Sequence, residues 1–162
     1  MATLYLICGL PGSGKTTLAK QIEQDHAALR FAPDEWIMRL LPEGWDSAEL
    51  DRLRTPVESI QWDTALRALK LGISVVLEWG FWSHEERAHY RELAYQVGAR
   101  VETLYLEVPL EELWARLKRR NANLPPGTFV VSKAELEFWW TLLEPPSPEE
   151  LALERQWTST TV

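Results

Sequence analysis

The segment Gly9–Thr17 constrains the fold more than any other part of this sequence. It reads GLPGSGKTT, and its first eight residues match the pattern G-x-x-x-x-G-K-[ST] in full. An apolar run precedes it at residues 2–8, and a helical pattern follows it at residues 14–24. A nucleotide phosphate-binding loop requires this context, a strand before it and a helix behind it. We therefore expect ATP with Mg²⁺ to bind here.

The residue types in the loop suit a triphosphate. Glycine allows a positive φ, so that backbone N–H groups can turn inward around phosphate oxygens. We expect Lys15 to bridge the β- and γ-phosphates and Thr16 to supply a hydroxyl to Mg²⁺. The other residues of the loop would surround the phosphates, namely Gly9, Leu10, Pro11, Gly12, Ser13, Gly14 and Thr17.

Strand-like and helix-like segments alternate along the rest of the chain. Buried strands are expected at residues 2–8, 29–32, 73–77 and 100–108, with helices between them. This alternation predicts the α/β class, as a three-layer fold around a parallel sheet of about five strands. Residues 1–162 would form a single domain with a lid around residues 116–131. Residues 158–162 would be frayed or form a short edge strand.

Capping patterns indicate where several helices begin. Residues 55–58, Thr-Pro-Val-Glu, combine a capping box with proline at the first helical position. A helix that starts near Ser47 is therefore expected to break there, and a new helix to begin. Ser83 and Ser132 open further capping boxes, and Ser147 fits another capped start.

The composition narrows the partners and the compartment. The 162 residues carry a net charge of -7, with a pI of about 5.0, which argues against a long nucleic-acid partner because such binding needs a basic face. The single cysteine, Cys8, lies in an apolar run and cannot form an intramolecular disulfide. No apolar run approaches the roughly 20 residues of a membrane span, and no leader pattern is present. We expect a cytoplasmic protein without membrane contact, either a monomer or a homodimer.

Motifs of other nucleotide-binding classes are missing, and a resemblance appears. The sequence contains neither N-K-x-D, which reads guanine in GTPases, nor the L-S-G-G-Q signature of transporter ATPases. Over roughly residues 3–144 it resembles the small P-loop kinases that include the kinase domain of bacteriophage polynucleotide kinase, chloramphenicol phosphotransferase and the zeta-toxin group. The resemblance rests on the loop, on Asp34 after the second strand, on Leu77–Gly80, and on Val108–Leu113 leading to three arginines. It implies an adenylate-kinase-like fold.

The resemblance also implies roles for two acidic residues. In these kinases the acid after the second strand accepts the proton of the acceptor hydroxyl, and Asp34 occupies that place. Asp34 could instead only cap the following helix, since aspartate is a common N-cap. Glu78 ends the third strand, where the family commonly has aspartate near Mg²⁺ or substrate. Glu78 would therefore contact the metal or the substrate, or serve only a structural hydrogen bond.

Arginines that follow the last expected strand are candidates for the lid. In the resembling kinases a lid arginine stabilises charge on the transferred phosphoryl group, because guanidinium is always charged and forks onto phosphate oxygens. Arg116, Arg119 and Arg120 end a helix before the loop at residues 121–128. Arg116 and Arg120 share a helix face and are the favoured catalytic pair, with Arg116 and Arg119 also expected at the nucleotide. Cations that favour a helix C-terminus are the alternative reading.

Aromatic and acidic residues gather in segments that should flank the acceptor. Aromatic rings there can stack on a flat ligand or bind a cation. We expect the acceptor to contact Asp34, Trp36, Arg39, Glu78, Trp79 and Trp82. Trp45 and Phe81 belong to the same group of rings, and Glu35, Glu43 and Asp46 add negative charge. Polynucleotide kinase has an arginine nearer the acid than Arg39, so an oligonucleotide acceptor fits less well.

These observations predict a kinase that transfers the ATP γ-phosphoryl group to a hydroxyl of a small molecule. A neutral or cationic acceptor, such as a sugar-containing natural product or antibiotic, suits the aromatic and acidic character. A 5′-hydroxyl polynucleotide kinase is the alternative enzyme. A non-catalytic ATP-binding regulatory protein is the alternative of another class.

Overall fold

Four parallel strands form the central sheet of the computed structural model, which describes residues 1–151. They are β1 (Thr3–Cys8), β2 (Leu29–Phe31), β3 (Val75–Gly80) and β4 (Arg100–Tyr105), in the sheet order β2-β3-β1-β4. All three pairings are parallel, which confirms the predicted α/β class. Within residues 1–151 the sheet has four strands, one fewer than expected. The segment considered for an edge strand, residues 158–162, lies outside the described residues.

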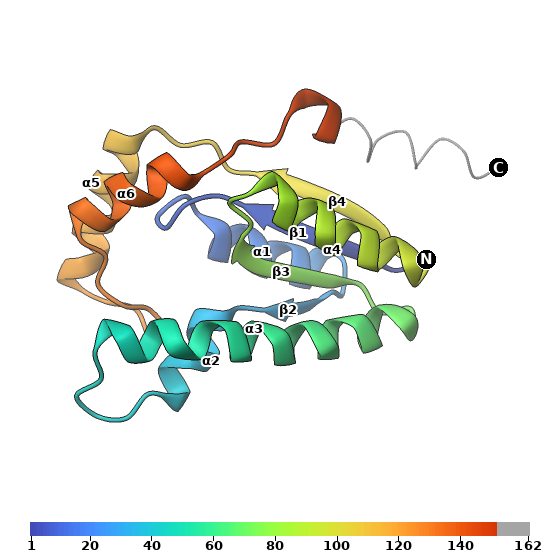
Figure 1. The fold of residues 1–162 in the computed structure, drawn as a ribbon, viewed down its shortest axis with the longest axis horizontal. Helices are drawn as coiled ribbons and strands as arrows, with labels where there is room; N and C mark the ends of the chain where they lie inside the picture. Colours follow the sequence, from blue (N-terminus) through green and yellow to red (C-terminus); the bar gives the residue numbers. More distant parts are fainter. Residues whose placement is uncertain (152–162) are drawn as a thin grey trace.

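Helices cover both faces of the sheet and make three layers (Figure 1). Helix α1 (Lys15–Asp25) packs on one face, and α3 (Ser47–Lys70) and α4 (His84–Gln96) cover the other. Helix α2 (Pro33–Leu40) packs against α3. Helices α5 (Leu110–Ala122) and α6 (Lys133–Leu142) lie beyond the end of the sheet toward which the strands run. This is the carboxyl edge, where α/β proteins bind ligands.

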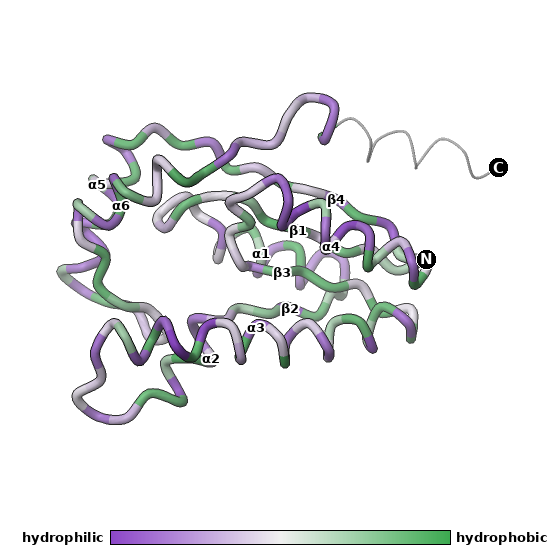
Figure 2. The backbone as a smooth tube through the Cα atoms, viewed as in Figure 1, coloured by the Kyte–Doolittle hydropathy of each residue, from purple (hydrophilic) through white to green (hydrophobic). Residues whose placement is uncertain are grey.

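The core follows from the alternation of side chains along the strands. In β1, Leu4, Leu6 and Cys8 face α3 and α4, while Tyr5 and Ile7 face α1. The tube is mostly apolar in colour along β1 and the first half of β3, which are buried on both faces, and alternates in colour along the edge strand β4 (Figure 2). No helix within residues 1–151 is long and apolar enough to cross a membrane.

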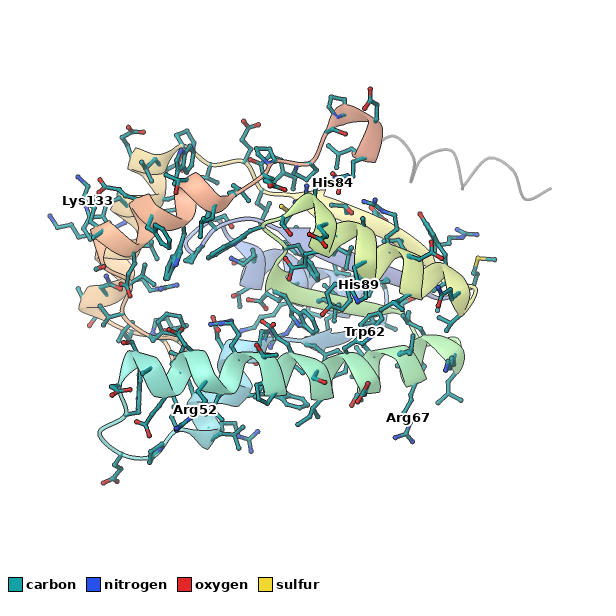
Figure 3. The ribbon with its side chains drawn as sticks, in the orientation of Figure 1. Arg52, Trp62, Arg67, His84, His89 and Lys133 are labelled. Atoms are coloured by element: carbon teal, nitrogen blue, oxygen red, sulfur yellow. The ribbon has the colours of Figure 1, made fainter. Side chains whose placement is uncertain are left out.

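Helix α3 is continuous, so the predicted break at residues 55–58 is wrong. Its start is capped by Asp46, which accepts from the Glu49 backbone N–H in a full capping box. Pro56 lies inside the helix on an exposed position, while Leu50, Val57 and neighbouring turns are buried against α2 and the sheet. Packing on both sides of the proline therefore outweighs the lost backbone hydrogen bond. Arg67 points away from the molecule on the outer side of α3 (Figure 3).

Other helix starts agree with the sequence. Ser83 caps α4 by accepting from the Glu86 backbone N–H at 3.1 Å, and Ser132 forms a capping box with Glu135 at the start of α6. Ser147 accepts from the Glu150 backbone N–H at 3.1 Å, in a helical turn near the end of the described chain. Side chain to backbone bonds three residues apart are local, and sequence patterns reveal them well.

Candidate active site

The phosphate-binding loop lies between β1 and α1 at the carboxyl edge of the sheet. The Gly9 backbone N–H donates to the Gly80 carbonyl at 2.9 Å, which ties the loop to the end of β3. Gly14 has a φ of 102° directly before α1, a conformation that favours glycine. The first N–H groups of α1 therefore open toward the loop, as an anion site requires. The Ser13 hydroxyl, in a residue only 5% exposed, has no hydrogen-bond partner within residues 1–151.

Lys15 and Thr16 stand at the mouth of the loop, beside Glu78 of β3. The Lys15 ammonium donates to the Leu10 carbonyl at 3.0 Å, so it is folded over the loop. Burial lowers the pKa of Lys15 to about 8, although the charges of Asp34 and Glu78 act in the opposite direction. The Thr16 hydroxyl donates to Glu78 Oε1.

Glu78 and Thr16 fit the chemistry of a magnesium site. Mg²⁺ takes hard oxygen ligands, typically one or two carboxylates together with substrate phosphates and water. Among residues 1–151 no three His, Cys, Asp or Glu side chains gather in a way that would hold a metal by themselves. A hydroxyl and a carboxylate beside a triphosphate-binding loop agree with a metal that arrives with its nucleotide.

A cavity of about 370 Å³ opens over the loop. Its floor is the loop and the start of α1, and its far wall is the segment that follows α5, from Pro125 to Val131. That segment is fixed to α5, because the Asn121 amide donates to the Val131 carbonyl at 2.7 Å. It also packs against α2, where a Cβ on Gly127 would lie 3.0 Å from Glu35 Cγ. We call this space the phosphate cavity.

The three candidate lid arginines have different surroundings. Arg116 and Arg120 both line the phosphate cavity, one helical turn apart on α5. Arg116 donates to the Gly12 and Ser13 carbonyls at 3.3 and 3.4 Å, and Arg120 to the Phe129 carbonyl at 3.2 Å. Arg119 is exposed and does not line the cavity.

Asp34 lies at the second position of α2 and does not cap it. The N-cap is Ala32, which makes no side-chain capping bond, so the alternative of a capping role is wrong. The Asp34 carboxylate instead accepts a hydrogen bond from the Arg54 guanidinium of α3, with 2.9 Å between Arg54 Nη2 and Asp34 Oδ1. Within residues 1–151 no hydrogen bond to Oδ2 is found. Asp34 therefore has one oxygen fixed by an arginine and one free to accept a proton.

A second cavity, of about 560 Å³, adjoins the phosphate cavity. Six aromatic residues line it, so we call it the aromatic cavity: Trp45, Trp79, Phe81, Trp82, Phe129 and Trp139. Its charged lining residues are Asp34, Asp51, Glu58, Glu78, Glu86 and Glu135, against Lys15 and Arg54. The volume is in the range of cavities that hold small molecules.

The two cavities meet at the phosphate-binding loop. They share six lining residues, which are Pro11, Lys15, Pro33, Asp34, Glu78 and Phe129. A ligand in the aromatic cavity would therefore face the end of a nucleotide at Lys15, with the Asp34 carboxylate at the boundary. Sequence reasoning placed Lys15, Asp34 and Glu78 together only through a resemblance, whereas the structure places them in one wall.

The wall of the aromatic cavity is built at the end of β3. Gly80 has a φ of 98° and Phe81 one of 45°, so the chain turns sharply after the strand. The Trp82 indole N–H donates to the Gly9 carbonyl at 3.3 Å, which fixes this ring against the loop. The Trp79 indole N–H donates to Gln61 of α3 at 3.1 Å. Both tryptophans line the cavity in fixed orientations.

Two residues expected at the acceptor lie outside both cavities. Trp36 is 37% exposed and packs edge-on against Phe31, with ring centroids 6.1 Å apart. Arg39 is exposed on α2. On a helix these positions point away from the face that carries Asp34 toward the cavities.

Several residues of the site were not found from the sequence. Arg30 of β2 joins Glu78 at 2.7 Å and Glu35 at 2.8 Å, and Arg54 joins Asp34. Glu58 and Trp139 line the aromatic cavity from α3 and α6. No local pattern marks them, because Glu78 is 48 residues from Arg30 and Asp34 is 20 residues from Arg54, and because the continuous α3 was not predicted.

Residues 4–146 match the model of a protein family described as an AAA domain. The chain belongs to this family. The match covers the sheet, the phosphate-binding loop and all six helices, so the loop is the nucleotide-binding element of a P-loop protein.

Solved structures share the fold at low sequence identity. A candidate kinase from Chloroflexus aurantiacus has a TM-score of 0.71 at 21% identity, covering 91% of this chain and 83% of that one. A sugar kinase from Janibacter sp. has a TM-score of 0.65 at 19% identity, covering 93% and 82%. A chain of the Pnkp1/Rnl/Hen1 RNA repair complex has a TM-score of 0.64 at 19% identity, covering 96% of this chain but 45% of that one. The fold is therefore that of the small P-loop kinases.

Proposed function

We propose that this protein is an ATP-dependent kinase that phosphorylates a hydroxyl group of a small molecule. One observation carries the proposal: the phosphate cavity and the aromatic cavity meet at Lys15, Asp34 and Glu78. A kinase needs this arrangement, in which donor and acceptor sites share a wall that holds a phosphate-binding cation and a carboxylate. The sugar kinase with the same fold agrees with a small acceptor.

Each residue of the site has a separate role in the proposed phosphoryl transfer. The acceptor hydroxyl oxygen attacks the γ-phosphorus, the bond from that phosphorus to the β–γ bridging oxygen breaks, and ADP leaves. Asp34 Oδ2 takes the hydroxyl proton while Arg54 holds Oδ1. Lys15, with Arg116 and Arg120 across the phosphate cavity, would neutralise charge on the transferred group. Mg²⁺ bound with ATP near Thr16 and Glu78 would supply further charge neutralisation.

The lining of the aromatic cavity favours a neutral or cationic acceptor over a phosphorylated one. Carboxylates outnumber basic groups there by six to two, and Lys15 is already directed at the phosphates. A strand of nucleic acid brings a row of phosphates, which this lining would repel. Flat rings on several sides suit a sugar or an aromatic system.

The proposal is tested by measuring ADP formation from Mg-ATP with a panel of acceptors. The panel holds nucleosides, 5′-hydroxyl oligonucleotides, sugars and hydroxyl-bearing antibiotics, each with the wild type and with Asp34→Asn. Asp25→Asn is the matched control, since Asp25 is exposed at the far end of α1. We expect one acceptor class to stimulate ADP formation, and Asp34→Asn to lower that stimulated rate by about 10²- to 10⁴-fold.

The outcomes separate three functions. Stimulation by a small hydroxyl compound that Asp34→Asn removes and Asp25→Asn leaves intact supports the proposal. Stimulation confined to the oligonucleotides would make the protein a polynucleotide kinase and refute the small-molecule acceptor. Tight Mg-ATP binding that no acceptor converts into ADP formation would instead support a nucleotide-dependent regulatory protein.

A further inference from the structure

Most of the charge in the aromatic cavity is not used by the proposed reaction. Asp34 is paired with Arg54, and Glu78 with Arg30 and Thr16. Glu135 belongs to the capping box that starts α6. Three carboxylates remain, of which Asp51 is exposed, whereas Glu58 of α3 and Glu86 of α4 are half-buried and enter the same cavity from two different helices.

Neither of these two carboxylates has a counterion of its own among residues 1–151, because Glu58 shares Arg54 with Asp34. Glu58 is 3.6 Å from Arg54, whose shorter contact, at 2.9 Å, is with Asp34. Glu86 forms no ion pair within residues 1–151, although backbone N–H groups of Trp82 and Ser83 contribute hydrogen bonds to it. Only 22% of the Glu58 side chain is exposed. A half-buried carboxylate loses part of its hydration, and a cation that approaches it offsets that cost.

Burial raises the proton affinity of both carboxylates, and the charge of Glu86 raises that of Glu58 further. Burial raises the pKa of Glu58 to about 7, with Glu86 and Asp34 adding to the rise and Arg54 opposing it. Burial also raises the pKa of Glu86. The pKa of Tyr90 rises to about 12 through burial and through the charges of Glu58 and Glu86. These three groups therefore form one electronegative region.

Aromatic rings beside this region add a second feature that suits a cation. Trp79 and Phe81 stack with ring centroids 5.8 Å apart, and Tyr90 meets them edge-on at 5.2 and 5.6 Å. Trp79 is held by Gln61, a fully buried residue whose Nε2 donor has no partner within residues 1–151. Trp62, on the side of α3 that faces α4, completes the cluster against Tyr90 at 4.8 Å (Figure 3). A fixed indole face beside two carboxylates attracts a cation through the cation–π interaction and through the negative charge of the carboxylates.

We propose that the acceptor carries an amine, whose ammonium group binds between Glu58 and Glu86 against the ring of Trp79 while its hydroxyl lies at Asp34. This inference rests on the proposed kinase and names its substrate class. We call the position the amine subsite. The subsite and Asp34 line one cavity, so a single small molecule reaches both.

The amine subsite has a defined pH dependence. Below pH 7 Glu58 is largely protonated in the free protein, so an ammonium must displace that proton in order to gain the full interaction. Affinity for an amine should therefore rise as pH increases through about 7, until the amine itself loses its proton. The charged and titratable groups that face Glu58 are Arg54, Glu86, Asp34 and Tyr90.

The experiment measures binding in the absence of nucleotide, through the indole N–H resonances of the tryptophans. The probes are 2-phenylethylamine, tyramine and glucosamine, each compared with its N-acetyl counterpart, which has the same skeleton and no charge. The variants are Glu58→Gln and Glu86→Gln, and the matched controls are Asp63→Asn on α3 and Glu85→Gln on α4, both exposed. Trp79→Phe assigns the resonance nearest the subsite.

We expect at least one amine to bind ten-fold or more tightly than its N-acetyl counterpart at pH 8. That preference should fall about ten-fold in each Glu→Gln variant and persist in both controls. Amines that bind no better than their acetylated counterparts, including a lack of binding by both, overturn the inference. The affinity of the wild type for the amine should also rise between pH 6 and pH 8, which is measured without any variant. An affinity that does not change over this range would mean that the amine binds away from Glu58.

Failure of this inference differs from failure of the proposed function. Asp34→Asn should keep amine binding and lose phosphoryl transfer. ADP formation that is stimulated only by neutral acceptors would support the kinase activity and refute the amine subsite. Amine binding at Trp79 without ADP formation in the presence of any acceptor would support the subsite and refute the kinase activity.

Discussion

Lys15 is the residue on which nucleotide binding most depends, and its environment makes that binding sensitive to pH. Burial lowers its pKa to about 8 in the free protein, whereas phosphates bound beside it would restore the charge. Affinity for Mg-ATP should therefore be full below pH 8 and fall as the pH rises above it. By linkage, the dissociation constant should increase about ten-fold or more between pH 7.5 and 9.5, as measured by calorimetric titration.

Lys15→Arg supplies the control for this prediction. Arginine keeps its charge throughout the range, so the variant should bind Mg-ATP more weakly overall but with little change between pH 7.5 and 9.5. An equal loss of affinity in the variant and the wild type would show that another group causes the pH dependence.

Residues inside a local motif were predictable, and residues paired across the fold were not. The loop that contains Lys15 is defined by neighbours a few positions away. Arg54, by contrast, contacts Asp34 twenty positions earlier, and only the packing of α2 on α3 brings them together. The resemblance predicted arginines at the nucleotide, and the spacing of Arg116 and Arg120 predicted their shared helix face; both residues line the phosphate cavity. Trp36 and Arg39 were predicted at the acceptor but line neither cavity, because the face of α2 that meets the cavities depends on that packing.

Helix α3 shows how tertiary packing overrides a local signal. Its sequence contains a strong start pattern at residues 55–58, yet the helix runs without interruption from Ser47 to Lys70. Buried side chains along its length, among them Leu50, Val57 and Ala65, hold it against α2 and the sheet. Full capping boxes form at Asp46 and Ser132, and Ser83 caps α4 through its side chain, because each of these residues stands where no helix directly precedes it.

Pro56→Ala tests that explanation at the scale of the helix. The substitution restores a backbone N–H inside α3 and removes the ring from the preceding turn, so it should stabilise the protein by about 1–2 kcal/mol. The gain is smaller than the full proline penalty, because proline also restricts the unfolded chain. Urea unfolding followed by circular dichroism measures the change. Ser59→Ala, exposed one turn further along, is the control and should change stability by no more than a few tenths of a kcal/mol.

A destabilised Pro56→Ala variant would contradict the continuous helix. It would mean that proline is needed at a break between two helices, and the placement of Glu58 in the aromatic cavity would then lose its support. The stability of Pro56→Ala and the position of Glu58 in the amine subsite therefore both depend on the continuity of α3 around residues 55–58.

At the scale of the whole molecule, the C-terminal turn and α4 are joined by a buried ion cluster behind the aromatic cavity. Glu150, 3% exposed, receives Arg87 at 2.6 Å and Arg91 at 3.1 Å, and lies 3.2 Å from His84. Arg87 is fully buried and also donates to the Phe81 carbonyl at 2.9 Å. The cluster therefore holds the turn after β3, which carries the rings of the cavity wall.

Glu150→Gln should destabilise the protein at pH 7 by about 3 kcal/mol, because it leaves the buried Arg87 charge without its partner. Glu149→Gln, the exposed neighbour, is the control. Urea unfolding measures both. Burial alone would raise the pKa of Glu150, but hydrogen bonds from Arg87 and His84 lower it to about 2. A lowered folded pKa gives stability that is present above the unfolded value and lost as the pH falls toward 2.

The difference between Glu150→Gln and the wild type should accordingly be constant from pH 8 to about 5 and narrow below pH 4.5, the range in which an unfolded glutamate takes up its proton. If the difference in the free energy of unfolding between the two proteins stays the same down to pH 3.5, the glutamine acts through packing and not through the lost charge. Because Arg87 also holds the Phe81 carbonyl, the variant should weaken amine binding at pH 8 while Mg-ATP binding at the loop is unchanged. Equal losses at both sites would mean that the cluster supports the fold as a whole and not the wall of the aromatic cavity.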